Sequence, residues 1–303
     1  MDRYSWSTKE LANAPILSTL YYKTKDGKTR PTWRFWRWLS IFLINLAFFL
    51  SFYFDIQFLE GTLTGSRLLG FHLIDPFVSL EILASEHHLH TNIIIGTLTV
   101  IGFYFIVGGK AFCGWVCPYG LLSEIGERIH QILVNKRVIK ERSFNPRVRY
   151  IFWAIFLLAA AINGYLVFEI INPVGIISRF IVYGWSLAIV WVFVILAIEI
   201  FFSRRAWCKY VCPIGTTYSF IGWVGPMKVQ WDMNKCDHCM ACFAVCPEDH
   251  VLEFAKAKYD EKRKKEGITK EFVKDGDCIM CARCFDVCHE DAYNFEFRLK
   301  NLI

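Results

Sequence analysis

The chain has 303 residues, of which 54% are hydrophobic and 17% aromatic, and it carries a formal net charge of +6. With a mean hydropathy of +0.32, it is too apolar for an ordinary soluble domain, and we expect an α-helical polytopic membrane protein. The excess of Lys and Arg is typical of basic loops beside a lipid surface, so it gives no support for nucleic-acid binding.

Residues 1–37 form a polar and basic N-terminal arm. Because this arm lacks the apolar segment of a secretory signal peptide, we expect no cleavage, and the first membrane span would act as its own insertion signal. The basic side chains of the arm are Arg3, Lys9, Lys23, Lys25, Lys28, Arg30, Arg34 and Arg37.

Four apolar segments follow, each without a charged residue. They are Trp38 to Phe54, Thr91 to Gly109, Tyr150 to Phe168, and Val182 to Ile198. Each is long enough, or nearly so, to cross a hydrocarbon core of about 30 Å. We therefore predict four transmembrane helices within a membrane domain at residues 38–225.

The loops between these predicted spans differ in their content of basic residues. Only Arg67 lies between the first and second spans, and only Arg179 between the third and fourth. The middle loop carries Arg128, Lys136, Arg137, Lys140, Arg142, Arg147 and Arg149. Because basic loops remain on the cytoplasmic side, we expect both termini, the middle loop and the C-terminal segment in the cytoplasm.

The membrane domain repeats a cysteine motif. Ala111 to Gly120 reads AFCGWVCPYG, and Ala206 to Gly215 reads AWCKYVCPIG, each directly after an even-numbered span. Asp75-Pro76 and Asn172-Pro173 occupy matching outer loops. Two spans per half with the same orientation predict a parallel duplication about an axis along the membrane normal.

The four cysteines of this repeat are Cys113, Cys117, Cys208 and Cys212. Cysteines at i and i+4 share a helix face, and the duplication would bring the two faces together near the midline. Four thiolates at one point suit a third iron–sulfur centre or Cu(I). A dithiol redox couple and cysteines that are merely buried are the other interpretations, and all four stay open.

The last quarter of the chain carries two identical cysteine runs. One is Cys236, Cys239, Cys242 and Cys246, followed by Pro247, and the other is Cys278, Cys281, Cys284 and Cys288, followed by His289. The spacing is that of two-cluster ferredoxins, in which the fourth cysteine of each run ligates the other cluster. Structural zinc fits two copies of one four-cysteine run poorly.

This pattern predicts two [4Fe-4S] clusters in a cytoplasmic ferredoxin-like α+β domain at residues 226–303. Cys236, Cys239, Cys242 and Cys288 would hold cluster 1, and Cys278, Cys281, Cys284 and Cys246 would hold cluster 2. Between the runs, the charged segment 256–274 is expected to be a solvated helix and loop, with a docking patch for an acidic partner as the alternative.

In this combination of spans, C-x3-C-P motifs and a two-cluster segment, the chain resembles the NapH family, the membrane ferredoxin-type subunits of periplasmic nitrate reductase systems. The resemblance covers nearly the whole chain. It is strongest in the segments 113–118, 168–174, 208–215 and 246–252. Ferredoxin-type proteins of methylamine utilisation, regulatory membrane proteins of nitrous-oxide respiration and copper-reducing factors of oxidase assembly share the C-x3-C-P architecture.

The resemblance implies a quinol dehydrogenase component in the bacterial inner membrane. Electrons from menaquinol or ubiquinol would pass through this subunit and a periplasmic iron–sulfur partner resembling NapG towards c-type cytochromes and nitrate reductase. The alternative is a maturation factor that reduces thiols or copper for a partner enzyme. No nucleotide-binding fingerprint or hydrolase triad is recognisable in the sequence.

A quinol site needs polar groups that accept two protons as the electrons leave. The outer-face candidates are His72, Asp75, Glu81, Glu86, His87, His88, His90 and Glu169. Most of them are expected to be ordinary loop residues. Glu169 is the preferred proton acceptor, because it ends the third predicted span beside Asn172-Pro173.

Overall fold

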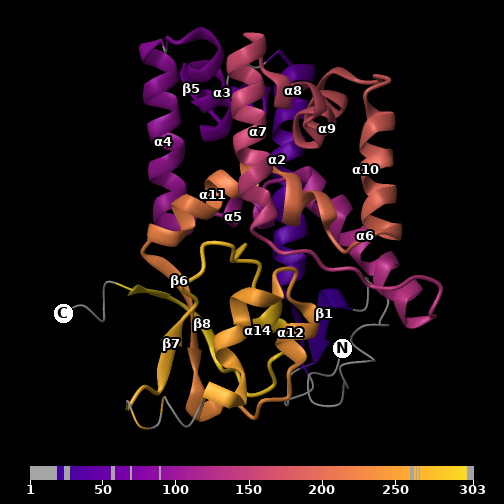
Figure 1. Ribbon diagram of the computed structural model, residues 1–303, viewed down its shortest axis with the longest axis vertical. Helices are drawn as coiled ribbons and strands as arrows, with labels where there is room; N and C mark the ends of the chain where they lie inside the picture. The colour runs from indigo at the N-terminus through magenta and orange to yellow at the C-terminus, as the bar shows by residue number, and fades with distance from the viewer. Residues whose placement is uncertain are drawn as a thin grey trace.

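The computed structural model describes residues 19–298, except 24–27, 56–58, 69, 89, 260–262, 264 and 266. The expected N-terminal arm therefore lies largely outside the described residues. A helical half occupies one end of the molecule, and the C-terminal segment forms a smaller α+β unit at the other end (Figure 1).

The N-terminal half of the chain begins with strands and one long helix. A hairpin of β1 (Tyr21–Lys23) and β2 (Thr29–Pro31) leads into α2 (Trp33–Tyr53). The antiparallel sheet β3-β4-β5 follows (Leu59–Thr62, Gly65–Leu68 and Phe71–Ile74). After this sheet come α3 (Pro76–Glu86), α4 (Thr91–Val107), α5 (Ala111–Trp115) and α6 (Pro118–Asn135).

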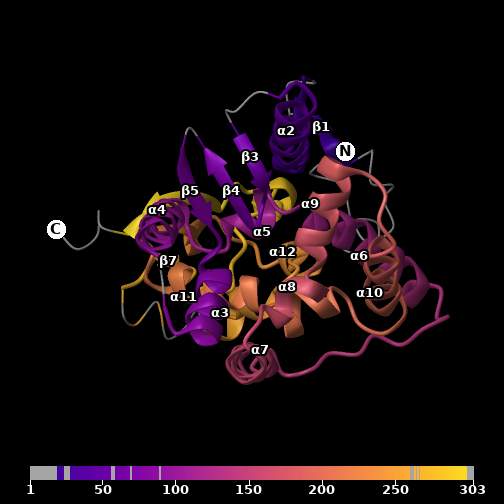
Figure 2. The same cartoon turned by 90° about the horizontal axis from the view of Figure 1, so that it is seen from above.

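The second half of the helical unit follows a similar order, with the short helix α8 in the place of the sheet β3-β4-β5. It comprises α7 (Val148–Asn163), α8 (Val167–Ile171), α9 (Pro173–Tyr183), α10 (Ile189–Phe201), a π-helical turn (Trp207–Val211) and α11 (Pro213–Val224). Seen from above, α2, α4, α7 and α10 stand around the periphery, and α3, α5 and α8 lie between them (Figure 2).

Two predicted spans differ from the helices observed. The third was expected to continue to Phe168, but α7 ends at Asn163, because Gly164 adopts φ 69° and turns the chain. The fourth was expected to begin at Val182, which belongs to the preceding helix, and α10 begins only at Ile189. A glycine with positive φ, Gly184, separates those two helices.

Within the described residues, α2 alone is both long and apolar enough to cross a membrane by itself, with 21 residues. Four shorter apolar helices accompany it, namely α4, α7, α9 and α10. Large apolar side chains on the peripheral helices are exposed, for example Leu98 (61%), Leu158 (62%) and Phe193 (62%). Exposed apolar surface on this scale marks contact with lipid or with another protein.

The C-terminal unit is built on a three-stranded antiparallel sheet in the order β7-β6-β8. Its strands are β6 (Met227–Asp232), β7 (Lys270–Phe272) and β8 (Tyr293–Phe297). Two one-turn helices, α12 (Ala241–Val245) and α14 (Arg283–Val287), precede the last cysteine of each run. Short 3-10 segments lie at Met233–Lys235, Asp249–Ala255 and Ala257–Tyr259.

The first long helix is capped by the C-terminal unit. Asp286 accepts hydrogen bonds from the backbone N–H groups of Trp33 (2.9 Å) and Arg34 (3.2 Å), which are more than 250 positions away in sequence. A carboxylate at a helix N-terminus satisfies orphan donors and complements the helix dipole. This contact therefore ties α2 to α14.

A buried ion network on α6 joins three parts of the chain. Glu124 pairs with Arg34 (2.8 Å), Arg37 (2.8 Å) and Arg283 (2.9 Å). Glu127, one turn later, pairs with Arg205 (2.7 Å) and Arg283 (3.0 Å). Buried charges are tolerated when they are paired in this way, so α6 holds the N-terminal helix and the C-terminal unit in register.

A second buried network crosses the same interface. Lys110 Nζ lies 3.0 Å from Asp277 and 3.5 Å from Glu248, and Arg149 pairs with the same two carboxylates. Asp277 also accepts a hydrogen bond from Ser219 (2.7 Å). Burial by itself would raise the pKa of Asp277, but Lys110 and the other donors hold this pKa well below its usual range.

Candidate electron-transfer centres

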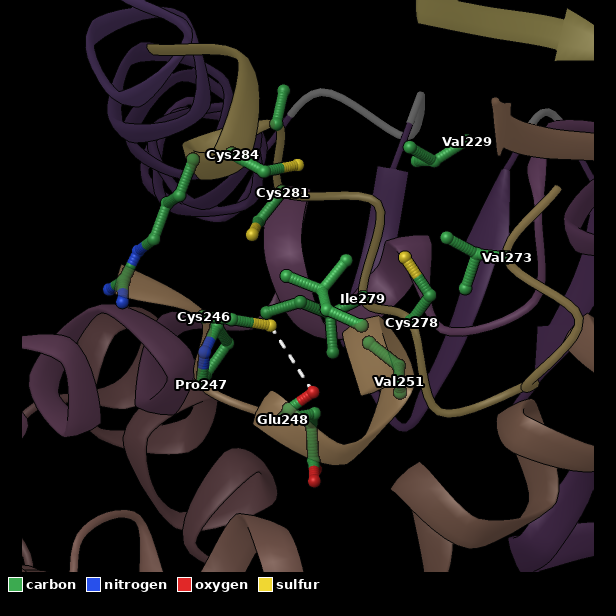
Figure 3. Close-up of a pocket in the computed structure, with 13 residues that line it drawn as sticks. Val229, Cys246, Pro247, Glu248, Val251, Val273, Cys278, Ile279, Cys281 and Cys284 are labelled. Carbon is green, nitrogen blue, oxygen red and sulfur yellow. Dashed lines mark hydrogen bonds between the residues drawn. The ribbon is translucent and has the colours of Figure 1, made fainter. Parts of the chain in front are cut away.

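Four cysteines that the sequence assigns to cluster 2 line one cavity. These are Cys246 from the first run with Cys278, Cys281 and Cys284 from the second. Figure 3 shows these four cysteines around the pocket, with Ile279 drawn between Cys246 and Cys278. The fourth cysteine of the first run therefore lies with three cysteines of the second run.

The cysteines assigned to cluster 1 also gather together. Cys242 interacts electrostatically with Cys236, Cys239 and Cys288. Tyr293 Oη donates a hydrogen bond to Cys242 Sγ (3.3 Å). Hydrogen bonds to sulfur are among the means by which proteins set the reduction potential of an iron–sulfur cluster.

The loops that carry these cysteines follow the same path in both runs. Met240 and Ala282 have positive φ angles of 61° and 54°, and each stands directly before its one-turn helix. This turn lets three cysteines at C-x2-C-x2-C spacing face the same side. Met280 and His238 adopt the left-handed conformation as well.

The donor set fits iron–sulfur clusters chemically. All twelve cysteines, every one of them among the described residues, are free of disulfide bonds. Burial raises the pKa of the Cys242 thiol to about 11 and that of Cys278 to about 12. Such thiols remain protonated in the empty protein, so binding of a metal cluster must displace their protons.

The four C-x3-C-P cysteines line a second cavity. Cys113, Cys117, Cys208 and Cys212 all line it, so the structure brings both copies of the motif to one place. The cysteines come from α5, from the π-helical turn and from the residues that precede α6 and α11. We call this cavity the four-cysteine site.

Several helices begin at the four-cysteine site. Cys117 is the N-cap of α6, and its sulfur accepts a hydrogen bond from Gly120 N (3.4 Å). Cys212 is the N-cap of α11, and Val174 in the first turn of α9 also lines the cavity. Helix N-termini carry partial positive charge, which favours thiolates and anionic clusters.

The four-cysteine site and the cluster 2 cavity are neighbours. Both are lined by Pro247, Glu248 and Ile279. Pro247 and Glu248 directly follow the cluster 2 cysteine Cys246, and Ile279 directly follows Cys278. Centres held in the two cavities would be separated by this one layer of residues.

Glu169, the predicted proton acceptor, lies in α8 rather than at the end of a span. Its carboxylate accepts hydrogen bonds from Thr64 (3.0 Å) and Asn172 (3.0 Å) and pairs with Arg179 (3.3 Å). It lines an open groove of about 690 Å³ together with the histidine His90. We call this the outer groove, because it lies at the end of the helical half remote from the C-terminal unit.

The other outer-face candidates fall into three groups. His87, His88 and Glu86 are exposed, as expected for loop or helix-end residues, and His72 is half-buried in β5. Asp75 and Glu81, in contrast, are buried, with exposed fractions of 5% and 0%. These two are not exposed loop residues, because they belong to the N-cap and the body of α3, which packs them in the interior.

The charged segment at residues 256–274 also contains a buried side chain. Arg263 is only 6% exposed, pairs with Glu271 (2.7 Å) and lies 5.2 Å over the ring of Trp231. Arg263 therefore packs against the β-sheet and is not part of a solvated surface. Lys262 and Lys264 lie outside the described residues.

Comparison with protein families finds iron–sulfur domains in two places. A model described as a 4Fe-4S binding domain matches residues 89–138 and again 183–231. A model described as a 4Fe-4S dicluster domain matches residues 235–292. The first model matches twice, and each match contains one C-x3-C-P motif, which agrees with the duplication read from the sequence.

Curated relatives cover nearly the whole chain. The ferredoxin-type protein NapH of Haemophilus influenzae is 33% identical, over 95% of this chain and 98% of its own length. NapH of Escherichia coli is 30% identical, over 88% and 91%. The methylamine utilization ferredoxin-type protein MauN of Paracoccus denitrificans is 31% identical, over 64% and 68%.

No solved structure matches the chain significantly. The assignment therefore depends on the two full-length NapH relatives and on the 4Fe-4S domain matches at both halves. On this evidence the chain belongs to the NapH family of ferredoxin-type iron–sulfur proteins.

Proposed function

We propose that this protein is a membrane electron-transfer subunit that takes electrons from menaquinol or ubiquinol and passes them to partner proteins. One observation carries the proposal. The four-cysteine site and the cluster 2 cavity share Pro247, Glu248 and Ile279, so the thiol sites form a continuous series from the helical half to the C-terminal unit. A buried series of redox sites is suited to electron transfer over a distance.

In this proposal the ferredoxin cysteines hold two [4Fe-4S] clusters. Cys246, Cys278, Cys281 and Cys284 would ligate one cluster, since they line one cavity. The other would be held by Cys236, Cys239, Cys242 and Cys288, which are electrostatic neighbours. Iron–sulfur clusters supply one-electron transfer without a change in ligands.

We further propose a third centre at the four-cysteine site. Cys113, Cys117, Cys208 and Cys212 provide four thiols, and two helix N-termini favour negative charge there. Support also comes from the 4Fe-4S model, which matches both segments that carry these cysteines. Metal analysis would distinguish an iron–sulfur centre from bound Cu(I), and it would find no metal if the four cysteines were redox-active dithiols.

The proposed topology is a multi-pass protein of the inner membrane, with α2, α4, α7 and α10 in the lipid. The exposed apolar faces of these helices support it. The domains proposed are the arm at 1–37, the membrane domain at 38–225 and the cytoplasmic ferredoxin-like domain at 226–303. The basic middle loop supports the cytoplasmic orientation.

We place the quinol head group in the outer groove, with Glu169 as a proton acceptor. Glu169 lies beside Gly175, where an added Cβ would be 2.7 Å from the carboxylate. Gly175 follows Val174, which lines the four-cysteine site. The groove and the first redox site would thus be connected through the first turn of α9.

The proposed partners are a periplasmic iron–sulfur subunit resembling NapG and c-type cytochromes of a nitrate reductase system. The full-length similarity to NapH proteins supports this context. The similarity to MauN, named for methylamine utilization, shows that the same architecture occurs in proteins named for another system. The acceptor would then depend on the partner that docks.

The test is anaerobic mixing of the oxidised protein in detergent with a menaquinol analogue, followed by visible absorption and EPR. We expect reduction of the iron–sulfur signals and roughly 12 iron atoms per chain rather than roughly 8. If dithionite reduces the centres and quinol does not, quinol oxidation by this chain is contradicted.

A maturation role is the second candidate, and the four-cysteine site discriminates between the two. Cys113→Ser and Cys208→Ser would abolish quinol-driven reduction of a partner oxidoreductase that is itself fully assembled. If the partner instead lacked its cofactor in these variants, the maturation role would be supported. The matched control is Ser203→Ala, which removes a hydroxyl that donates to the Arg142 carbonyl at the inner loop (2.6 Å).

A further inference from the structure

The half-helices α3 and α9 occupy matching positions in the two repeats but differ in charge. Each has 11 residues and begins with proline after a capping side chain, Asp75 in α3 and Asn172 in α9. Counting from these caps, Glu81 of α3 corresponds to Ser178 of α9. The first repeat therefore carries two carboxyl groups where the second carries neutral side chains.

The two capping residues make the same hydrogen bond. Asp75 Oδ1 accepts from Phe77 N at 2.8 Å, and Asn172 Oδ1 accepts from Val174 N at 3.1 Å. An amide oxygen and a carboxylate oxygen are comparable N-caps. The fold therefore needs an acceptor at this position but does not need a carboxyl group.

The residues at the second matched position also make equivalent bonds. Glu81 Oε1 accepts from the backbone N–H of Phe168 at 2.9 Å, and Ser178 Oγ accepts from that of Leu63 at 3.2 Å. Each bond runs from one repeat to the other. A neutral oxygen again performs the structural role in the second repeat.

Glu81 carries an additional oxygen that the structural bond does not use. Its Oε2 atom is buried and has no hydrogen-bond partner among the residues that the structure describes. A buried polar atom without a partner costs free energy, and ionisable side chains at membrane depth commonly mark pathways for ions or protons. The comparison with Ser178 shows that the fold could do without it.

These carboxyl groups lie between the outer groove and the four-cysteine site. Glu81 interacts electrostatically with Glu169, which lines the groove, and with Asp75. Asp75 interacts with Tyr218, whose ring stacks on Phe112 with centroids 5.1 Å apart, and Phe112 lines the four-cysteine site.

The charged and titratable groups around this series are few. Those that face Asp75 are Tyr104 on α4, Tyr218 on α11, Glu169 on α8, and the thiols of Cys113 and Cys212. Glu81 faces Glu169 and Asp75. Arg179 pairs with Glu169 at the groove, and Lys110 lines the four-cysteine site on its inner side.

We propose that Glu81 and Asp75 take up a proton from the outer groove, by way of Glu169, when the four-cysteine site is reduced. This inference depends on the redox centre proposed at that site. An electron added there increases negative charge in a low-dielectric interior, and protonation of a nearby carboxylate compensates it.

The exchange balances without a further reactant. If the four cysteines held a redox centre, its reduction would add one negative charge, and a carboxylate oxygen would form an O–H bond with one proton from the buffered solvent at the groove. On reoxidation the same O–H bond would break, and the proton would return by way of Glu169 to the solvent. The carboxyl groups themselves are neither oxidised nor reduced.

The test is a potentiometric EPR titration of the purified protein at several pH values with dithionite, so that it does not require quinol. In the wild type, the ratio of reduced to oxidised four-cysteine centre should fall about tenfold per pH unit at fixed potential, a shift of about 59 mV for one electron. In Asp75→Asn with Glu81→Gln, this dependence should be lost.

Two controls separate proton uptake from structural damage. Ser178→Ala removes the equivalent bond in the second repeat, and Glu60→Gln removes an exposed acid on β3, outside the outer groove, so both should keep the wild-type slope. The iron content and the signals of the two ferredoxin clusters should be unchanged in every variant. Glu81→Asp combined with Asp75→Asn should have a steeper slope than the double variant, because it keeps a carboxyl group at position 81.

A wild-type potential that does not change with pH would overturn the inference and leave electron transfer standing. A slope that persists in the double variant would overturn it as well. If EPR detects no third centre at all, the proposed centre and this inference fall together. Quinol oxidation is measured separately by the mixing experiment, so its failure is distinguishable.

Discussion

Each group of four ferredoxin cysteines draws one member from the other run. Cys246 lines the cavity of the second run, although it lies more than 30 positions before Cys278. The equivalent residue of the second run, Cys288, interacts with Cys236 and Cys239. The two runs are therefore interlocked, and neither set is complete without a residue from the other run.

This interlocking predicts the effect of a single substitution. Cys288→Ser is expected to remove the cluster held with Cys236, Cys239 and Cys242, because a [4Fe-4S] cluster needs four ligands, and to lower the iron content by roughly four atoms per chain. EPR of the reduced protein should still show the other cluster. Loss of the signal associated with Cys278 and Cys281 would contradict the exchange of ligands.

His289→Pro is the matched control for this substitution. It gives the second run the proline that follows the first run at Pro247, and it changes no thiol. Both clusters should remain, with at most a small change in the EPR line shape.

The lowered pKa of Glu127 makes the stability of the protein depend on pH. Burial alone would raise its pKa, but Arg283, Arg205 and Arg204 lower this pKa from 4.5 to about 2. A carboxyl whose folded pKa lies below its unfolded value stabilises the protein above the unfolded pKa, and the contribution is lost as the pH falls.

We therefore expect Glu127 to contribute about 3 kcal/mol of stability at neutral pH. That contribution should disappear between pH 4.5 and pH 2. Thermal unfolding followed across this range would show it. Glu127→Gln should be less stable at neutral pH but lose less stability on acidification; equal acid sensitivity in the two proteins would contradict this assignment.

At the scale of elements, close contacts between backbones position the C-terminal unit. Gly109, after α4, lies against Gly222 of α11, and an added Cβ would come within 2.1 Å of Gly222 N and 2.2 Å of Tyr218 O. Gly222 in turn approaches Gly276, just before Cys278. These glycines let the helical half approach the second cysteine run.

Gly109→Ala is accordingly expected to lower the free energy of unfolding by about 1–3 kcal/mol, because overpacking forces backbone shifts. Gly102→Ala on α4 is the matched control, since nothing lies within 4 Å of its added Cβ. Thermal unfolding in detergent should show a lower midpoint for the first variant only. Equal midpoints would contradict the close packing of α4 on α11.

For the whole molecule, the main prediction concerns orientation in the membrane. Alkaline phosphatase fused after Glu86 should be active, because the phosphatase folds only outside the cytoplasm. A fluorescent protein fused to the C-terminus should fluoresce from the cytoplasmic side. A fusion within the basic loop at Lys136 is the internal control and should lack phosphatase activity.

Inactive phosphatase after Glu86 would contradict the four-span topology. It would also move the outer groove and Glu169 to the other side of the membrane or into the bilayer. The order of the redox sites would remain, because it follows from the shared walls of the cavities.

Much of the site was predictable from local sequence. The eight ferredoxin cysteines and their spacing follow from how a tight loop wraps a cubane cluster, and the C-x3-C-P duplication is visible as a repeat. In the structure the four repeated cysteines line one cavity. Short-range spacing is read directly because it depends on few residues.

The predictions that failed concerned segments whose partners are distant in sequence. Hydropathy joined α7 to α8 and missed the half-helices α3 and α9, because an apolar sequence does not show where Gly164 or Pro173 turns the chain in three dimensions. For the same reason Glu81 and Asp75 looked like loop residues.

The sequence by itself determined the chemistry of the ligands and their grouping in fours, because thiol type and loop spacing are local properties. Only the tertiary structure decided that the four-cysteine site adjoins the cluster 2 cavity and that Glu81 is buried beside Glu169. Those relations depend on helix packing and on ion pairs such as Lys110 with Asp277, which join residues more than 160 positions apart.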